Sequence, residues 1–501
     1  MTTEIHPAEH GEAAVANVCS TGSRERSPKS WFDDAKLGVF VHWGLYSVPA
    51  WAPLGPDLQT LLHDEGPREM LRRMPYAEWY MNTMAIPGSP TRAHHVATRG
   101  ADFAYDDFRP AFDEASAAAD LDAIAGLAAE AGAGYVVLTS KHSDGFALWP
   151  TALTHPRKGD WHARRDLVGG LADAVRASGL RMGLYYCAGY DWSYVGHPVR
   201  RGADLLLAIP TSREYEKFAA AQVRELVDRY APDVLWGDVA WPVGEEIDAL
   251  VAHYRARVPD GLVNDRFAVI PGLDGRARRA LLRVAGRAVE ALWSRLPSER
   301  RRLVFPPSPL ADFTTPEYRV PDTLPAGKWE LARGIGHSFG ANLAEGPGEI
   351  LGGDALVRLF CEVVAGGGNL LVGVGPDAHG RVSEPQAAPL RELGAWLRRN
   401  AAAIRGSRPW TVSGGRTAEG GRWAATVTAG VVHLLLLDPP ARGDVVVRGL
   451  SSERVVAAHH VGLDRSLAVR ASGGDLVVSL PSGRPAEAVE VVRLEGDPRP
   501  R

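Results

Sequence analysis

The feature that most constrains this chain is an alternation of short β-branched runs with helical stretches, which continues from about residue 31 to about residue 405. Between the runs, apolar residues recur at three- and four-residue spacing, as they do on one face of a helix. Alternation over this length favours an α/β fold, a (β/α)8-type, TIM-like barrel, over a small open sheet. The expected strands are 38–42, 135–139, 181–186, 234–236, 261–264 and 369–374, and the expected helices include 121–131, 167–177 and 215–230.

The pattern changes after about residue 405, where short β-rich runs are separated by Gly, Pro, Asp and Ser. This change predicts a C-terminal antiparallel β-sandwich over 405–501. The barrel then spans 29–404, and the polar residues 1–28 predict a disordered N-terminal tail. The β-rich runs of the sandwich are 423–428, 431–437, 445–447, 476–480 and 488–494.

Charge and cysteine content narrow the partners and the compartment. The 56 Lys and Arg residues nearly balance the 60 Asp and Glu residues, so the net charge of −4 gives no electrostatic case for a nucleic-acid partner. No apolar run approaches the ~18 residues that a membrane-spanning helix needs, so we expect no membrane partner. The 3 cysteines are too few for a disulfide framework, and the N-terminus lacks the pattern of a signal peptide. We therefore expect a cytoplasmic location.

A basic segment interrupts the alternation between Arg276 and Arg302, where nine arginines occur. Its apolar residues recur at helical spacing, which predicts a basic amphipathic helix in an insertion over about 268–311. Such a helix either binds a membrane surface or packs its apolar stripe on protein. The stripe favours packing, on the barrel or on a second subunit, so a homo-oligomer stays open. The stripe consists of Leu281, Val284, Ala285, Ala288, Val289, Leu292, Trp293 and Leu296.

Polar residues follow five of the expected strands, at the point where each apolar run stops. The active site of a parallel barrel lies at the carboxyl ends of its strands, so these residues should meet at one rim. Polar residues from five strands that meet on one face favour a polar pocket over unrelated structural residues. They are His42 after the first run, His142 after the second, Tyr185 and Tyr186 at the end of the third, Asp238 after the fourth, and Asp265 with Arg266 after the fifth.

The sequence does not point to a metal or cofactor site. His42 and His142 belong to separate strands and have no metal-ligand spacing, so a binuclear metal hydrolase is the weaker alternative. No Gly-x-Gly-x-x-Gly joins a strand to a helix, and no Gly-x-Ser-x-Gly occurs. We expect no metal and no organic cofactor.

Two carboxylates fit glycosidic cleavage, which needs one near the anomeric carbon and one near the leaving oxygen. Asp238 ends a strand between Trp236 and Trp241 and is the candidate nucleophile. Glu317 lies on an expected loop, from which it could protonate a leaving group. An ordinary surface role for Glu317 fits this pattern equally well.

Nine motifs in order resemble glycoside hydrolase family 29, the retaining α-L-fucosidases, over about residues 31–500. The resemblance implies the family's barrel followed by a β-sandwich, and a match of this many ordered motifs is not a chance event. The motifs are WFDDAKLGVFVHWG (31–44), YAEWY (76–80), KHSDGF (141–146), GLYY (183–186), PDVLWGD (232–238), VNDR (263–266), TPEY (315–318), GIGHSFG (334–340) and GNLLVGVGP (368–376).

The resemblance also implies the roles of the site residues. The nucleophile falls on Asp238 and the acid/base on Glu317. The residues expected to grip the sugar hydroxyls are His42, Glu78, Trp79, His142, Tyr185 and Arg266, with Phe339 as an apolar wall beside the sugar's methyl group.

Two departures from the family pattern bear on specificity. Ser143 stands where the family usually has a second histidine, and the basic insertion separates Arg266 from Glu317. Loss of an imidazole should leave space in the pocket, which puts a strict preference for fucose in question. The insertion starts and ends at active-site loops, so we expect it to rise on the catalytic face and shape the leaving-group side.

The function expected from the residues and the resemblance is that of a retaining exo-α-L-fucosidase. It would hydrolyse a fucosylated glycan or glycoside through a covalent glycosyl-enzyme. A transglycosidase, or a glycosidase for a related 6-deoxy or galacto-configured sugar, is the alternative within this chemistry. A catalytically inactive sugar-binding protein is the alternative from another class.

Overall fold

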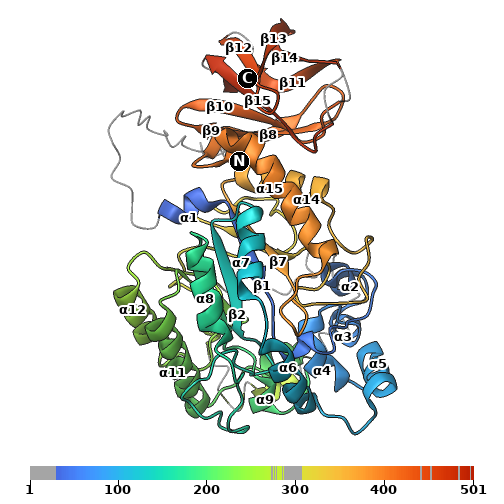
Figure 1. Cartoon of the computed structure of the whole chain (residues 1–501), viewed down its shortest axis with the longest axis vertical. Coiled ribbons are helices and arrows are strands. Elements are labelled where there is room, and N and C mark those ends of the chain that lie inside the picture. Colours follow the sequence, from blue (N-terminus) through green and yellow to red (C-terminus); the bar gives the residue numbers. More distant parts are fainter. Residues whose placement is uncertain are drawn as a thin grey trace, which may run out of the picture.

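The structure of the chain is a computed structural model that describes residues 30–271, 275, 277, 279–284, 286, 307–440, 443–451, 454–482, 486–496 and 498–500. The predicted N-terminal tail lies outside these residues, and so does most of the predicted insertion over 268–311. Figure 1 shows a barrel domain below and a β-sandwich above it, with the long helix α15 (Glu384–Ile404) beneath the sandwich.

Seven parallel strands form the barrel sheet in the order β5-β4-β3-β2-β1-β7-β6. Most of their residues are buried, as expected for a parallel sheet covered by helices on its outer face. Every expected strand is present, although the two ends of each shift by up to two residues. The strands are β1 (Leu37–Val41), β2 (Tyr135–Lys141), β3 (Arg181–Cys187), β4 (Val234–Asp238), β5 (Leu262–Val263), β6 (Glu330–Gly334) and β7 (Asn369–Val374).

An eighth segment, residues 313–317, closes the ring between β5 and β6. Phe313 forms a parallel bridge to Asn264, and Glu317 forms one to Ala332. The backbone N–H of Ala332 donates to the carbonyl of Pro316 at 3.0 Å. The predicted α/β barrel with eight positions is therefore confirmed, and Glu317 lies at one of those positions.

Helices cover the outside of the barrel, and their starts follow from the sequence. Asp120, Asp166 and Ser212 each accept a backbone N–H bond and so cap the three helices predicted from apolar spacing. Figure 1 shows α7, α8 and α11 on the outer face of the barrel. The other helices of the described residues are α1 (Ser30–Ala35), α2 (Leu58–Asp64), α3 (Pro67–Arg72), α4 (Tyr80–Met84), α5 (Pro90–Arg99), α6 (Arg109–Ser116), α9 (Trp192–Val195), α10 (Gly202–Leu207), α12 (Ile247–Arg257) and α14 (Gly353–Ala365), and the three predicted ones are α7 (Leu121–Glu130), α8 (Leu167–Ala177) and α11 (Arg213–Tyr230).

The C-terminal strands form an antiparallel sandwich in the order β16-β11-β14-β13-β12-β15-β10-β9-β8, which confirms the predicted fold class. Its core includes Trp423, Leu434 and Val478. The indole N–H of Trp396 in α15 donates to the carbonyl of Val489 at 2.9 Å and joins the sandwich to the barrel. The strands are β8 (Arg408–Arg416), β9 (Arg422–Thr428), β10 (Val431–Leu436), β11 (Gly443–Ser451), β12 (Val455–His460), β13 (Arg465–Ser472), β14 (Asp475–Leu480), β15 (Glu490–Gly496) and β16 (Arg499–Pro500).

The described part of the arginine-rich segment packs in a different phase from the predicted stripe. Leu281 and Val284 belong to the predicted stripe, yet they are 65% and 71% exposed. Leu282 packs on the barrel's apolar cluster, and the Arg279 guanidinium donates to the carbonyl of Leu207 at 2.6 Å. The side of this segment that faces the barrel therefore includes Arg279 and Leu282, neither of which belongs to the predicted stripe. The rest of the stripe, Ala285, Ala288, Val289, Leu292, Trp293 and Leu296, lies outside the described residues.

The described residues contain neither a membrane-spanning helix nor a metal-binding cluster. Among them, no helix is long and apolar enough to cross a membrane. Nor does any group of three His, Cys, Asp or Glu side chains in that part of the chain have the arrangement of a metal site.

Candidate active site

Asp238 is the last residue of β4, so its carboxylate stands at the carboxyl end of the barrel. Its Oδ1 accepts from Arg266 Nη1 at 3.0 Å and from its neighbour's backbone N–H at 2.8 Å, and its Oδ2 accepts from Tyr185 Oη at 2.8 Å. The side chain keeps 20% of its surface exposed. The carboxylate is therefore held in one orientation by three donors while part of it stays open to a ligand.

Arg266 connects the two candidate carboxylates. Its Nη2 lies 2.7 Å from Oε1 of Glu317, while its Nη1 bonds Asp238. Its Nε and Nη2 also donate to the hydroxyl and the carbonyl of Thr315, at 2.9 and 3.0 Å. Burial lowers the pKa of this guanidinium, but Glu317 and Asp238 outweigh burial and raise the pKa above its ordinary value. The Arg266 guanidinium thus holds both carboxylates at the carboxyl end of the barrel.

The residue after each carboxylate has a strained backbone. Val239 follows Asp238 with φ of 66°, and Tyr318 follows Glu317 with φ of 60°. Residues other than glycine rarely adopt positive φ, and a β-branched valine is among the least suited to it. Such strain persists where the surrounding structure fixes it, and it clusters at functional sites.

An aromatic stack packs against this cluster. The Tyr185 and Trp236 rings are stacked with centroids 5.6 Å apart, and the Arg266 guanidinium lies 5.0 Å from the Trp236 ring. Trp236 Nε1 donates to Glu330 Oε1 at 2.9 Å, and Tyr135 Oη donates to the other oxygen of Glu330. Glu330 could not be predicted from the sequence, because the strand that carries it has no long apolar run.

Two imidazoles and a phenyl ring adjoin Tyr185. The His142 ring stacks on Tyr185 with centroids 5.3 Å apart, and the His42 ring stacks on Phe339 at 4.8 Å. Nδ1 of His42 and Nδ1 of His142 are buried without a hydrogen-bond partner among the described residues. Burial lowers the pKa of His142 to about 4 and holds the pKa of His42 well below its ordinary value. Both rings are therefore neutral at pH 7, and each presents an unused polar nitrogen.

Glu78 and Trp79 enter from a short 3-10 helix (Ala77–Trp79). Glu78 Oε2 accepts from Ser338 Oγ at 3.1 Å and from the backbone N–H of Gly340 at 2.9 Å. Burial raises the pKa of the Glu78 carboxyl to about 7, although these hydrogen bonds act in the opposite direction. Trp79 packs edge-on against Trp192, with ring centroids 5.1 Å apart.

A cavity of about 470 Å³ opens beside this cluster. Four of the nine predicted site residues line it, and they are Trp79, Asp238, Arg266 and Glu317. The other five are 1–6% exposed, and Tyr185 among them bonds the cavity residue Asp238 directly. They are His42, Glu78, His142, Tyr185 and Phe339. The cavity residues of α2 and α3 were not predicted either, because their apolar side chains resemble those of ordinary helix cores.

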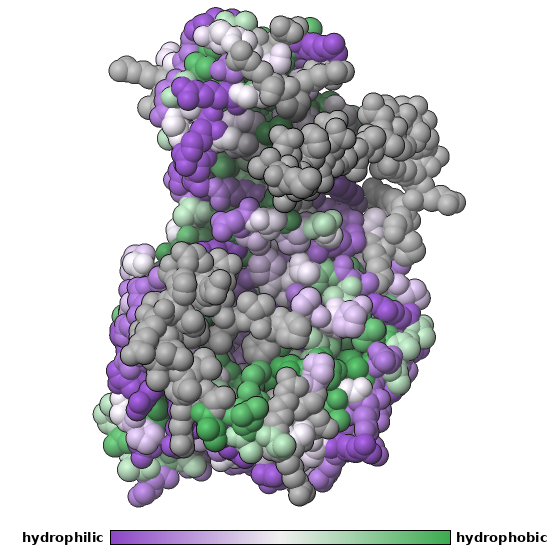
Figure 2. Space-filling model, turned by 180° about the vertical axis from the view of Figure 1, so that it is seen from behind, coloured by the Kyte–Doolittle hydropathy of each residue, from purple (hydrophilic) through white to green (hydrophobic). Residues whose placement is uncertain are grey.

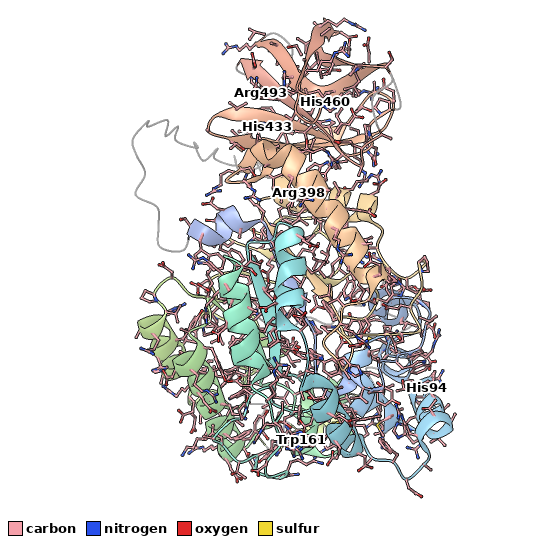
Figure 3. All side chains as sticks on the ribbon, viewed as in Figure 1. His94, Trp161, Arg398, His433, His460 and Arg493 are labelled. Atoms are coloured by element: carbon pink, nitrogen blue, oxygen red, sulfur yellow. The ribbon has the colours of Figure 1, made fainter. Side chains whose placement is uncertain are left out.

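Ser143 and two buried histidines lie outside the described lining of the cavity. Ser143 is 1% exposed, and its Oγ lies 3.4 Å from Sγ of Cys187. It is absent from the described lining of the cavity, so the effect of this departure on selectivity stays a prediction. Two buried histidines, His433 and His460, lie in the sandwich and not at the barrel mouth (Figure 3).

Comparison with known proteins identifies the class. A family model for alpha-L-fucosidase matches residues 5–402. The alpha-L-fucosidase of Dictyostelium discoideum is 28% identical over 88% of this chain and 85% of that protein. The tissue alpha-L-fucosidase of Bos taurus is 28% identical over 93% of this chain and 88% of that protein. The structure of Thermotoga maritima alpha-fucosidase with a mechanism-based inhibitor is 35% identical with a TM-score of 0.78, and the match covers 94% of this chain and 97% of that one.

The barrel, the sandwich and these relatives define a glycoside hydrolase. Within that class, the chain belongs to the alpha-L-fucosidase family, glycoside hydrolase family 29, and the resemblance found in its motifs is confirmed.

Proposed function

We propose that this enzyme is a retaining exo-α-L-fucosidase in which Asp238 is the nucleophile and Glu317 the acid/base. The observation that carries the proposal is the Arg266 guanidinium, which bonds both carboxylates at the edge of one cavity. The positive φ of the residue after each carboxylate supports the same pair.

The proposed reaction has two steps. Asp238 attacks the anomeric carbon as the bond to the leaving oxygen breaks, and Glu317 gives that oxygen its proton. In the second step Glu317 takes a proton from water, whose oxygen attacks the anomeric carbon and releases Asp238. Two inversions at one carbon give net retention, which in this mechanism requires carboxylates ~5–5.5 Å apart.

The buried aromatic group would hold the sugar. His42 and His142 each have an unpartnered Nδ1, and a neutral imidazole offers one donor and one acceptor to neighbouring hydroxyls. Phe339 gives an apolar surface beside His42, which suits the methyl group of a 6-deoxy sugar. Glu78 and Trp79 would make further contacts with the sugar. Fucosylated glycans or glycosides are therefore the proposed substrates.

The test compares aryl α-L-fucoside, β-D-galactoside and α-L-arabinoside side by side. We expect the fucoside to be hydrolysed with the highest kcat/KM, and NMR at early times to show α-L-fucose as the first product. A β-anomer as the first product would remove Asp238 from the nucleophile role. Saturable fucose binding without turnover of any aryl glycoside would mark a sugar-binding protein instead.

A further inference from the structure

The cavity has a second side that the proposed chemistry does not use. Two helices after the first barrel strand, α2 and α3, line it together with α10 and the residue that follows Asp238. The side chains that they contribute are almost all apolar. They are Leu58, Leu62, Met70, Met74, Leu205 and Val239.

This apolar wall lines the same cavity as the proposed acid/base Glu317, and Trp79 of the proposed sugar-binding residues also belongs to that cavity. Asp57, which caps α2, interacts electrostatically with Arg319, two residues after Glu317. Its neighbour Leu58 lines the same cavity as Pro316 and Glu317, the segment that carries the proposed acid/base. The rings proposed to hold the sugar, those of His42 and Phe339, do not belong to the described cavity lining. A leaving group protonated by Glu317 would extend along the wall.

Several hydrogen-bonding groups near the wall are already engaged, although the buried Tyr76 hydroxyl, which also lines the cavity, has no hydrogen-bond partner among the described residues. Arg266 uses its Nε, Nη1 and Nη2 on Thr315 and the two carboxylates. Asp265 accepts from the Thr315 hydroxyl at 2.6 Å, and the Tyr190 hydroxyl donates to a backbone carbonyl at 2.8 Å. Gln59 is the one amide side chain among the described lining residues. A second sugar needs many directional hydrogen bonds, and this wall offers few.

Methionine and leucine instead offer dispersion contacts and an adaptable shape. Leu62, Met70 and Met74 are each no more than 3% exposed, so the wall is enclosed rather than a bare surface. Figure 2 shows hydrophobic side chains gathered in a band across the lower half of the face seen there.

We propose that the wall is a leaving-group subsite for an apolar alcohol, so that the preferred substrates are alkyl or aryl α-L-fucosides and not fucosylated oligosaccharides. The inference rests on the proposed function, because it needs Glu317 to protonate the leaving oxygen. It assigns the specificity of the leaving group to α2, α3 and α10.

The first experiment uses methyl, butyl and octyl α-L-fucoside with the full-length enzyme, below the critical micelle concentration. The three alcohols have similar acidity, so differences in kcat/KM report contacts beyond the glycosidic oxygen. Each buried methylene favours binding several-fold, so we expect kcat/KM to rise at least tenfold from methyl to octyl. An α-1,2-fucosylgalactose disaccharide should fall below the octyl compound. Equal values along the series, or a faster disaccharide, would overturn the inference while fucoside turnover itself still upheld the proposed function.

The second experiment tests whether the apolar wall causes the rise in kcat/KM from methyl to octyl α-L-fucoside. Leu58→Asn puts a polar amide on a partly buried wall residue, and the ratio of octyl to methyl kcat/KM should fall about threefold or more. The matched control is Leu343→Asn, at a leucine that is 74% exposed and lies outside the cavity lining. It should keep the wild-type ratio. A ratio unchanged by Leu58→Asn, or lowered equally by both variants, would contradict the assignment.

Discussion

Glu330→Gln should make the enzyme more stable at pH 8 and leave its stability at pH 4.5 almost unchanged. Glu330 is fully buried under Trp236, and burial raises its carboxyl pKa from the ordinary 4.5 to about 7. Between these two pH values the folded protein keeps the proton and the unfolded chain has lost it. The free energy of unfolding must therefore fall as pH rises from 4.5 to 7.

The size of the effect follows from the shift. One pKa unit corresponds to about 1.4 kcal/mol, so a rise to about 7 amounts to roughly 3 kcal/mol by pH 8. Glutamine mimics the protonated acid, since its oxygen can accept from Trp236 and its amide can donate to the Tyr135 hydroxyl. The glutamine side chain does not titrate, so the free energy of unfolding of the variant does not fall in this way as pH rises.

The assay is denaturant unfolding of wild type and variant from pH 4.5 to pH 8. The difference in unfolding free energy should grow with pH through the window from 4.5 to 7. Glu114→Gln, at an exposed glutamate of α6, makes the same charge change and should give a difference that does not vary with pH. A Glu330→Gln difference that is constant over the range would refute the reasoning.

Three further predictions concern the site. Arg266→Lys cannot bond both carboxylates at once, and the loss of charge-assisted hydrogen bonds of ~1.5–3 kcal/mol each should lower aryl-fucoside kcat/KM at least tenfold; an unchanged value would contradict it. His142 has a pKa of about 4 when folded, so wild type loses stability as pH falls from 6.5 to 4, and His142→Gln should lose less over this window in thermal unfolding. Ser143→His should sharpen the preference for fucoside over galactoside by about two- to twelvefold, the worth of one neutral hydrogen bond, and unchanged ratios would show that position 143 does not contact the sugar.

The sequence predicted the parts of the barrel whose strands are apolar runs. Asp238 could be placed at a rim because an uninterrupted run of buried residues precedes it. Strand β6 and the segment 313–317 were missed, since Pro316 and charged residues break the apolar pattern and tertiary pairing alone makes them part of the barrel. Strands β8 and β13 of the sandwich were missed because they are largely exposed and have no continuous apolar run.

Side-chain contacts between distant segments could not be predicted from local sequence patterns. Nothing in the spacing indicates that Arg266 would bond both Asp238 and Glu317, which belong to different barrel positions. Glu78 entered the candidate site only through the resemblance, because no strand leads to it. In the described part of the arginine-rich segment, Leu281 and Val284 of the predicted stripe are exposed, because the long Arg279 side chain instead packs inward and donates to the backbone carbonyls of Leu207 and Ile209.

The assignment of Asp238 and Glu317 is tested most directly by azide rescue of two variants on an aryl α-L-fucoside. In Asp238→Gly, azide can enter from the face that the carboxylate occupied, attack the anomeric carbon and expel the phenolate, which gives β-L-fucosyl azide. In Glu317→Ala, azide should instead attack the glycosyl-enzyme from the other face and give α-L-fucosyl azide. We expect both rescues, with opposite anomers. The same anomer from both variants, or no rescue of Asp238→Gly, would contradict the account.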